Sequence, residues 1–170
     1  MNSTIDKDVY TEIAKLLTLD KAVLSDLALC FESPKAYFDM NFERYDERGF
    51  EGSEDLDVLA WIGIVDELIE SGDIIELDWN ECLEEFILQM KYMADKKHLK
   101  IEEEWFDKNA NIILWCEILD QKWKEQGFCV GAMDIDSDSY VMFICKNEIL
   151  EKLVLLGKKI SKRFDRATNM

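Results

Sequence analysis

The sequence predicts an α+β protein: a small, mostly antiparallel sheet of about three or four strands, packed against about six helices. Two observations predict this fold class. Residues 55–71 and 111–126 repeat apolar side chains at the i, i+3, i+4 spacing of amphipathic helices. Residues 128–135 and 140–145 are rich in β-branched and aromatic side chains and flank a polar segment, which is typical of an antiparallel hairpin.

The N-terminal part of the chain predicts helices. The first 30 residues contain two short apolar stripes, and Asp20 is positioned to cap the second helix. Ser33-Pro34 is typical of a helix start, with serine as the N-cap and proline in the first turn. Residues 42–52 are ambiguous, and Asp46, Arg48 and Gly49 within them favour a turn or a small hairpin.

The remaining elements follow from similar signals. Residues 74–78 predict a short strand, and Asn80 is expected to cap the helix that follows it. A helical crossover from this strand to residues 128–134 would allow the two to pair in parallel. Asn147 is expected to cap the final helix, and residues 161–170 to form a frayed basic tail.

The composition limits the classes of protein to consider. The chain has 170 residues with a net charge of −17, and it contains one proline and no Gly/Ser-rich linker, so a single domain over residues 1–170 is expected. With 48% hydrophobic residues it is not a disordered chain. The strongly negative charge argues against a nucleic-acid partner, because neutralisation of phosphates supplies much of that affinity.

Targeting and redox signals predict a cytoplasmic protein. The N-terminus lacks the apolar core of a signal peptide. The longest apolar run, 58–65, falls far short of the roughly 20 residues of a membrane span. The five cysteines are odd in number, form no C-x-x-C motif and lie in apolar stretches, so we expect reduced, buried thiols.

The charge is concentrated in one window. Residues 49–90 contain thirteen acids and no Lys, Arg or His. The window can form a solvated surface balanced by the basic tail, or a docking surface for a basic protein partner. For the docking surface, the expected partner-binding residues are Asp57, Asp66, Glu67, Glu70, Asp73, Trp79, Glu81, Glu84 and Glu85.

A second candidate site is an aspartate cluster. Residues 134–138 read D-x-D-x-D, like the start of a calcium loop, but Ser139 and Cys145 stand where an EF-hand needs glycine and glutamate. The segment is therefore either a polar turn or a site for a small molecule or divalent cation. A metal would be held by Asp78, Asp134, Asp136 and Asp138.

No recognisable catalytic motif is present, so no enzymatic activity and no cofactor are expected beyond that possible divalent cation. The single histidine, His98, lies in a lysine-rich segment that favours a solvated turn. Trp61, Trp115 and Trp123 fall on expected core faces, whereas Trp79 and Trp105 lie at element edges, where tryptophan can anchor a partner.

One pattern resembles a known family. Gly72-x-Ile74-x-x-Leu77-Asp78-Trp79 is followed by a helix, and later by Gly127-Phe128 and Asp134-x-Asp136-Ser137-Asp138-Ser139-Tyr140. Over about residues 55–160 this is similar to an uncharacterised bacterial domain-of-unknown-function family of small acidic proteins, whose members often have lysine where this chain has Asn80. The resemblance implies a fold and no activity. In size, acidity and α+β layout the chain also resembles bacterial immunity proteins, including the Smi1/Knr4-like group.

Together these observations favour a cytoplasmic, non-catalytic module that docks a basic protein, with toxin neutralisation as one concrete form. The alternative is a small-molecule or divalent-cation binding protein that uses the aspartate cluster. A structural or oligomeric role, with an uncovered sheet face or the edge strand at 139–145 pairing with another copy, is a third possibility.

Overall fold

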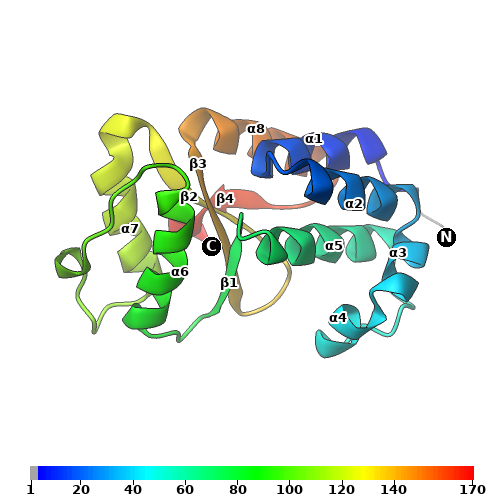
Figure 1. Cartoon of the computed structure of the whole chain (residues 1–170), viewed down its shortest axis with the longest axis horizontal. Coiled ribbons are helices and arrows are strands. Elements are labelled where there is room, and N and C mark those ends of the chain that lie inside the picture. Colours follow the sequence, from blue (N-terminus) through cyan, green and yellow to red (C-terminus); the bar gives the residue numbers. More distant parts are fainter. Residues whose placement is uncertain (1–3) are drawn as a thin grey trace. The chain divides into compact units, whose positions relative to one another are not determined.

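The computed structural model describes residues 4–170 and divides into two compact units. The first unit ends at Ser71 and is helical. The second runs from Gly72 to Met170 and contains the sheet (Figure 1). The expected α+β class is confirmed, with a four-stranded antiparallel sheet and, within residues 4–170, eight α-helices instead of about six. The single-domain organisation stays a prediction.

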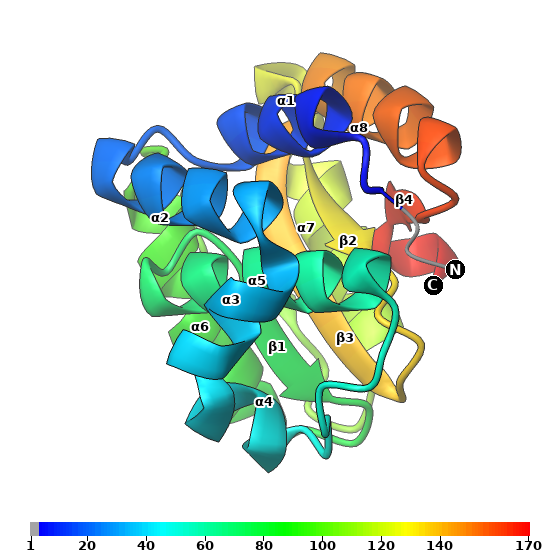
Figure 2. The ribbon, with the colours of Figure 1, turned by 90° about the vertical axis from the view of Figure 1, so that its right-hand side faces the viewer.

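The first unit contains helices α1 to α5, and α2 and α3 both pack against α5 (Figure 2). Asp6 and Asp20 cap α1 and α2, because their carboxylates accept hydrogen bonds from backbone N–H groups in the first turns. The apolar faces then bury tyrosine and phenylalanine rings, among them Tyr10, Phe31 and Phe38. The helices of this unit are α1 (Lys7–Leu17), α2 (Lys21–Glu32), α3 (Pro34–Met40), α4 (Phe42–Glu47) and α5 (Leu56–Glu70).

Residues 42–47, for which the sequence favours a turn or hairpin, form helix α4 instead. Tertiary contacts stabilise this short helix. Tyr45 is buried, and its hydroxyl donates to the carbonyl oxygen of Leu59 on α5 at 2.8 Å. Gly49 does lie where the backbone turns, because it has a φ of 81° just after the helix, a conformation that glycine adopts readily. The glycine therefore marks the end of a helix and not the turn of a hairpin.

The sheet of the second unit has the strand order β1-β3-β2-β4, and each neighbouring pair is antiparallel. The expected hairpin is confirmed as β2 and β3. The expected parallel pairing of residues 74–78 with 128–134 is wrong, because β3 lies between them and pairs with both. The strands are β1 (Ile75–Asp78), β2 (Phe128–Met133), β3 (Ser139–Lys146) and β4 (Phe164–Arg166).

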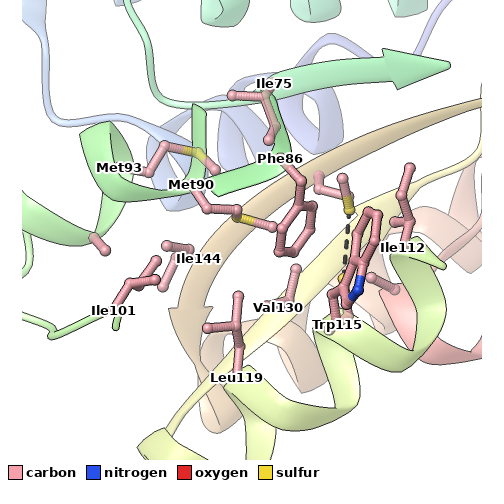
Figure 3. Packing of buried hydrophobic residues seen from close by; sticks show 14 of the residues in the cluster. Ile75, Phe86, Met90, Met93, Ile101, Ile112, Trp115, Leu119, Val130 and Ile144 are labelled. Carbon is pink, nitrogen blue, oxygen red and sulfur yellow. Dashed lines mark hydrogen bonds between the residues drawn. The ribbon is translucent and has the colours of Figure 1, made fainter. Parts of the chain in front are cut away.

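Helices cover both faces of this sheet. Side chains of α6 and α7 pack against alternate residues of β2 and β3, such as Val130 and Met142, to form an apolar core that contains Phe86, Met90 and Trp115 (Figure 3). Helix α8 lies against the opposite face, where Leu150 meets the strands beside Gly131. The helices of this unit are α6 (Leu83–Asp95), α7 (Ile112–Trp123) and α8 (Asn147–Lys159), with 3₁₀ turns η1 (Glu103–Trp105), η2 (Lys124–Gln126) and η3 (Ala167–Asn169).

The expected frayed tail at residues 161–170 is also wrong. Phe164–Arg166 form strand β4, which pairs with β2, and Phe164 and Ala167 are buried. The chain returns close to α8 at Gly157, where an added Cβ would lie 2.6 Å from the Lys162 carbonyl oxygen. Burial of a few apolar side chains thus orders a segment whose sequence is mostly polar.

Two of the expected helix caps are not formed. Asn80 does not cap α6, which has Cys82 at its N-cap, and Asn147 is the first residue of α8 rather than its cap. The carboxamide oxygen of Asn111 does cap α7 by accepting from the Leu114 N–H at 3.1 Å. Asparagine favours caps and turns alike, so its position along the chain does not decide between the two.

The side chains whose burial was predicted individually can be compared with the structure. Trp61, Trp115 and Trp123 are buried as expected, and His98 lies in an exposed turn. The five thiols are free, but Cys82 is exposed, contrary to the expectation, because it precedes α6 instead of facing the core. Among residues 4–170, no helix combines the length and the apolar character needed to cross a bilayer.

Candidate binding site at the end of the sheet

The aspartate-rich segment forms the turn between β2 and β3. The Asp134 carboxylate accepts the N–H of Asp136 at 2.8 Å, and the Ser137 hydroxyl accepts the N–H of Ser139 at 3.1 Å. Asp136 adopts a left-handed conformation with φ at 59°, which aspartate tolerates better than most residues. These contacts fold the turn, so the D-x-D-x-D pattern is in the first place a turn signal.

A cavity of about 290 Å³ opens beside this turn. Its position follows from strand register, because Leu77 lies opposite Tyr140 and Asp78 lies opposite Ser139. Trp79, which directly follows β1, is therefore next to the start of β3. The cavity is lined by Trp79, Ala132, Met133, Asp134, Ser137, Asp138, Ser139, Tyr140, Val141, Arg163 and Met170. It therefore combines an apolar floor from β2 and β3 with two aromatic rings and a charged rim.

The charged groups of the rim are unequal in number. Asp134 and Asp138 contribute two carboxylates, whereas Arg163 contributes one guanidinium. That guanidinium is already engaged, because it donates to the Asn169 carbonyl oxygen at 2.6 Å and lies 3.6 Å from the Asp165 carboxylate. The cavity thus presents two carboxylates, a guanidinium that is already paired, and the rings of Trp79 and Tyr140.

The four aspartates of the predicted metal site are not drawn together as a coordination sphere. Asp134 and Asp138 line the cavity, Asp136 is exposed on the turn, and the Asp78 carboxylate accepts from the Asn80 N–H at 3.2 Å. Within the described residues, no group of three or more His, Cys, Asp or Glu side chains is arranged to hold a metal ion.

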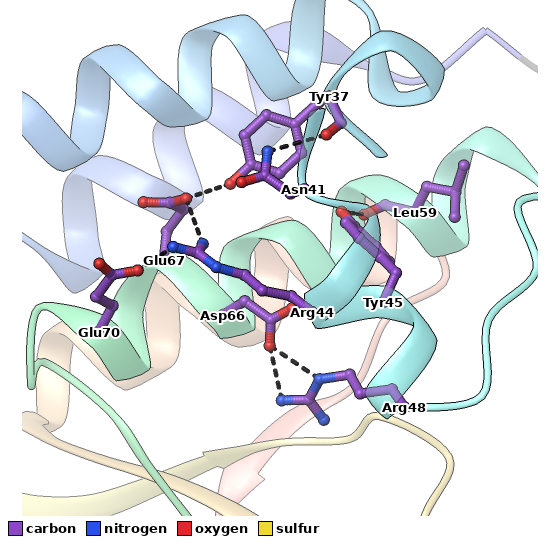
Figure 4. Close-up of polar contacts among 9 residues, drawn as sticks. All are labelled: Tyr37, Asn41, Arg44, Tyr45, Arg48, Leu59, Asp66, Glu67 and Glu70. Atoms are coloured by element: carbon purple, nitrogen blue, oxygen red, sulfur yellow. Dashed lines mark hydrogen bonds and ion pairs between the residues drawn. The ribbon is translucent and has the colours of Figure 1, made fainter. Parts of the chain in front are cut away.

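The acids predicted to bind a partner divide between the two units. In the first unit, Asp66 and Glu67 are largely buried, with side-chain exposures of 10% and 11%. The Arg48 guanidinium donates to Asp66 at 2.8 Å, and the Arg44 guanidinium donates to Glu67 at 2.9 Å and also pairs with Glu70 (Figure 4). Asp66 and Glu67 thus hold α4 on α5 and offer little charge to a partner, whereas Glu70 is exposed.

Tyrosines complete this network. The Tyr37 hydroxyl donates to Glu67, and the Tyr10 hydroxyl donates to Asp57 at 2.6 Å. Burial, together with the hydrogen bond to Glu67, raises the pKa of Tyr37 far above its ordinary value. Burial and the nearby Glu67 charge also raise the pKa of the Cys30 thiol to about 12, so this thiol stays protonated. The network is a structural one.

The sequence signal for this network is the placement of two arginines. Arg44 and Arg48 are four residues apart and lie just before the cation-free window, so on a helix they face the same side. They were missed because residues 42–52 were not expected to be helical. A cavity of about 320 Å³ lies beside the network, but Arg44, Glu67 and Glu70 in its lining already pair with one another.

In the second unit, the predicted acids remain closer to solvent. Asp73 lies 3.5 Å from Lys96, and the Glu81 carboxylate accepts from the Cys82 N–H. The first turn of α6 carries Glu84 and Glu85, of which Glu84 is exposed. Trp79, five residues before Glu84, is 59% exposed, which is unusual for so large an apolar ring.

A family model matches residues 9–167, and the chain therefore belongs to the family described as a domain of unknown function, DUF6630. The match spans nearly all of the chain and includes residues of both compact units. Neither the search of curated proteins nor the search of solved structures found a match. The resemblance to a domain-of-unknown-function family is confirmed in this form.

Proposed function

We propose that this protein is a binding module that docks a basic protein partner through the second unit. The observation that carries the proposal is the cavity of about 290 Å³, which is lined by the exposed Trp79, the half-buried Tyr140 and the carboxylates of Asp134 and Asp138. An arginine or lysine side chain of the partner fits this arrangement, because an aromatic face and a carboxylate both attract a cation.

The surrounding charge supports a basic partner. Glu84 and Glu85 stand in the first turn of α6, within six residues of Trp79, and the whole chain has a net charge of −17. Such a field speeds the association of a positively charged protein and disfavours acidic ones. Neutralisation of a basic toxin, as immunity proteins achieve it, is a concrete form of this function.

The experiment compares partner capture by two baits from the native cell lysate. The wild-type chain is expected to retain one basic protein that elutes at moderate salt, because exposed charges are screened within about 8–10 Å at physiological ionic strength. The triple variant Trp79→Ala, Asp134→Asn, Asp138→Asn is expected to lose it. Equal capture by both baits, or elution that does not respond to salt, contradicts the proposal.

The cation that enters the cavity need not belong to a protein. A small cationic metabolite is therefore a second candidate, favoured by the same cavity. Specific binding to the folded state would raise its stability by roughly 2.7 kcal/mol at a ligand concentration 100 times the Kd. A thermal-shift screen with agmatine, arginine and the neutral control citrulline tests this candidate. Mg²⁺, Ca²⁺ and Mn²⁺ are included, and a shift that survives Asp134→Asn with Asp138→Asn reflects general relief of charge repulsion.

A further inference from the structure

Two cysteines of the second unit face each other across the central strands of the sheet. Cys129 on β2 and Cys145 on β3 are direct partners in the antiparallel register. Opposed residues in such a ladder have Cα atoms about 4.5–5.5 Å apart, which lies inside the range of about 4.4–6.8 Å that a disulfide requires. Both side chains stand on the same face of the sheet, because directly opposed residues point the same way.

The surroundings act in opposite directions on the pKa values of the two thiols. The backbone N–H of Leu150, in the first turn of α8, favours the charged form of Cys145, because a helix N-terminus favours negative charge. The Cys145 thiol donates to Cys129, and with the charge of Arg166 nearby this hydrogen bond lowers the pKa of Cys129. The same hydrogen bond raises the pKa of Cys145, the donor.

The other thiols of the chain lack these features. Cys30 and Cys116 are buried and have no cysteine opposite them, and Cys116 contacts the Met142 sulfur at 3.7 Å. Cys82 is exposed and stands alone at the start of α6. Cys129 is completely buried and Cys145 is 7% exposed, so only a small oxidant can reach the pair.

We propose that Cys129 and Cys145 form a modification site, a dithiol that a small peroxide converts reversibly into a cross-strand disulfide. One thiolate attacks the O–O bond of hydrogen peroxide to give a sulfenic acid and hydroxide, which takes up a proton to become water. The neighbouring thiol then displaces the sulfenic hydroxyl group as a second water and forms the S–S bond. Two thiols are oxidised and one peroxide is reduced to two waters.

The test uses the full-length chain with Cys82→Ala, which removes the exposed thiol. The folded protein is treated with hydrogen peroxide, unfolded, alkylated with iodoacetamide and digested with trypsin. Lys124 and Lys146 bound a single tryptic peptide, residues 125–146, that contains both cysteines. We expect this peptide to appear without alkyl groups and about 2 Da lighter than its dithiol form, while Cys30 and Cys116 are alkylated. Dithiothreitol is expected to restore two alkylation sites.

Two further measurements separate the native geometry from simple proximity in sequence. Cys145→Ala is expected to abolish the 2 Da loss, and circular dichroism confirms that the variant is folded. Oxidation of the urea-unfolded chain at the same peroxide dose is expected to be at least tenfold slower to form the disulfide. A doubly alkylated peptide from the folded protein, separate sulfinic acids on the two cysteines, or equal rates in the folded and unfolded chain overturns the proposal.

Discussion

The two compact units use the same acidic stretch of sequence in opposite ways. In the first unit, Asp66 and Glu67 turn inward and pair with arginines that lie outside the cation-free window. In the second unit, Glu84 and Trp79 remain exposed. A run of acids in a sequence therefore does not predict an acidic surface, because cations from other parts of the chain can pair with some of the carboxylates.

The cores of the two units also satisfy their polar atoms differently. Tyrosine hydroxyls of the first unit donate to the carboxylates of Asp57 and Glu67. Tryptophan indoles of the second unit donate to main-chain carbonyl oxygens, Trp115 to Asp107 at 2.8 Å and Trp123 to Lys100 at 3.0 Å. Tyr10 and Tyr37 thus depend on carboxylates for their hydrogen bonds, whereas Trp115 and Trp123 depend on neutral main-chain acceptors, and substitutions can separate the two.

The largest effect is expected from Trp115→Ala in the second unit. Trp115 is 2% exposed and packs on Phe86 with ring centroids 5.3 Å apart, so its removal leaves a cavity and costs about 3–5 kcal/mol of the free energy of unfolding. The matched control is Trp79→Ala, which is expected to change that free energy by less than about 0.5 kcal/mol. Urea denaturation measures both, and equal losses would contradict the division of core and surface.

A smaller effect is expected from Arg44→Ala in the first unit. This change leaves the buried Glu67 carboxylate with Tyr37 as its remaining donor. It is expected to lower the free energy of unfolding by about 2 kcal/mol, which is less than the loss for a fully buried pair because Arg44 is partly exposed. The matched control is Arg163→Ala, whose ion pair with Asp165 is exposed and is worth less than about 1 kcal/mol. A loss no larger than that of the control would show that Glu67 is solvated or protonated.

The smallest effect concerns pH. Burial raises the pKa of Asp120 above its ordinary value, against the opposing hydrogen bonds from the Val130 N–H and Arg166. A raised pKa means that the contribution of this group is complete at low pH and is lost as pH rises through the folded-state pKa. The stability of the wild type relative to Asp120→Asn should therefore fall as pH rises above about 3.9, the ordinary pKa of an aspartate. Thermal unfolding above that pH checks the sign, and a rising difference would mean that the Arg166 pair dominates.

Local sequence patterns predicted most of the fold. The helices at 55–71 and 111–126 and the hairpin were predictable because their apolar periodicities are long. Helix α4 was not, because its six residues are too few to show a period and depend on Tyr45 reaching Leu59 on α5. Strand β4 was missed for a similar reason: three residues in a polar tail become a strand only because β2 offers an unpaired edge.

The candidate site was predictable in part. The Asp134–Asp138 segment and Trp79 were singled out as parts of two separate candidate sites, and the cavity brings Trp79, Asp134 and Asp138 together. The strands of Asp78 and Asp134 are not neighbours, because β3 lies between β1 and β2, but both strands end at the same end of the sheet. Arg163 was missed as a lining residue, since it belongs to the segment expected to be frayed.

The sequence by itself determined the α+β class, the hairpin, the burial of three tryptophans and the excess of negative charge, because these depend on periodicity and composition. Only the tertiary structure decided which acids are neutralised, which strands are neighbours and which two thiols meet. Pairing of charges and of strands depends on residues far apart in the chain, as with Arg44 and Glu67 or β2 and β4. A sequence pattern does not give the distance in space between such partners.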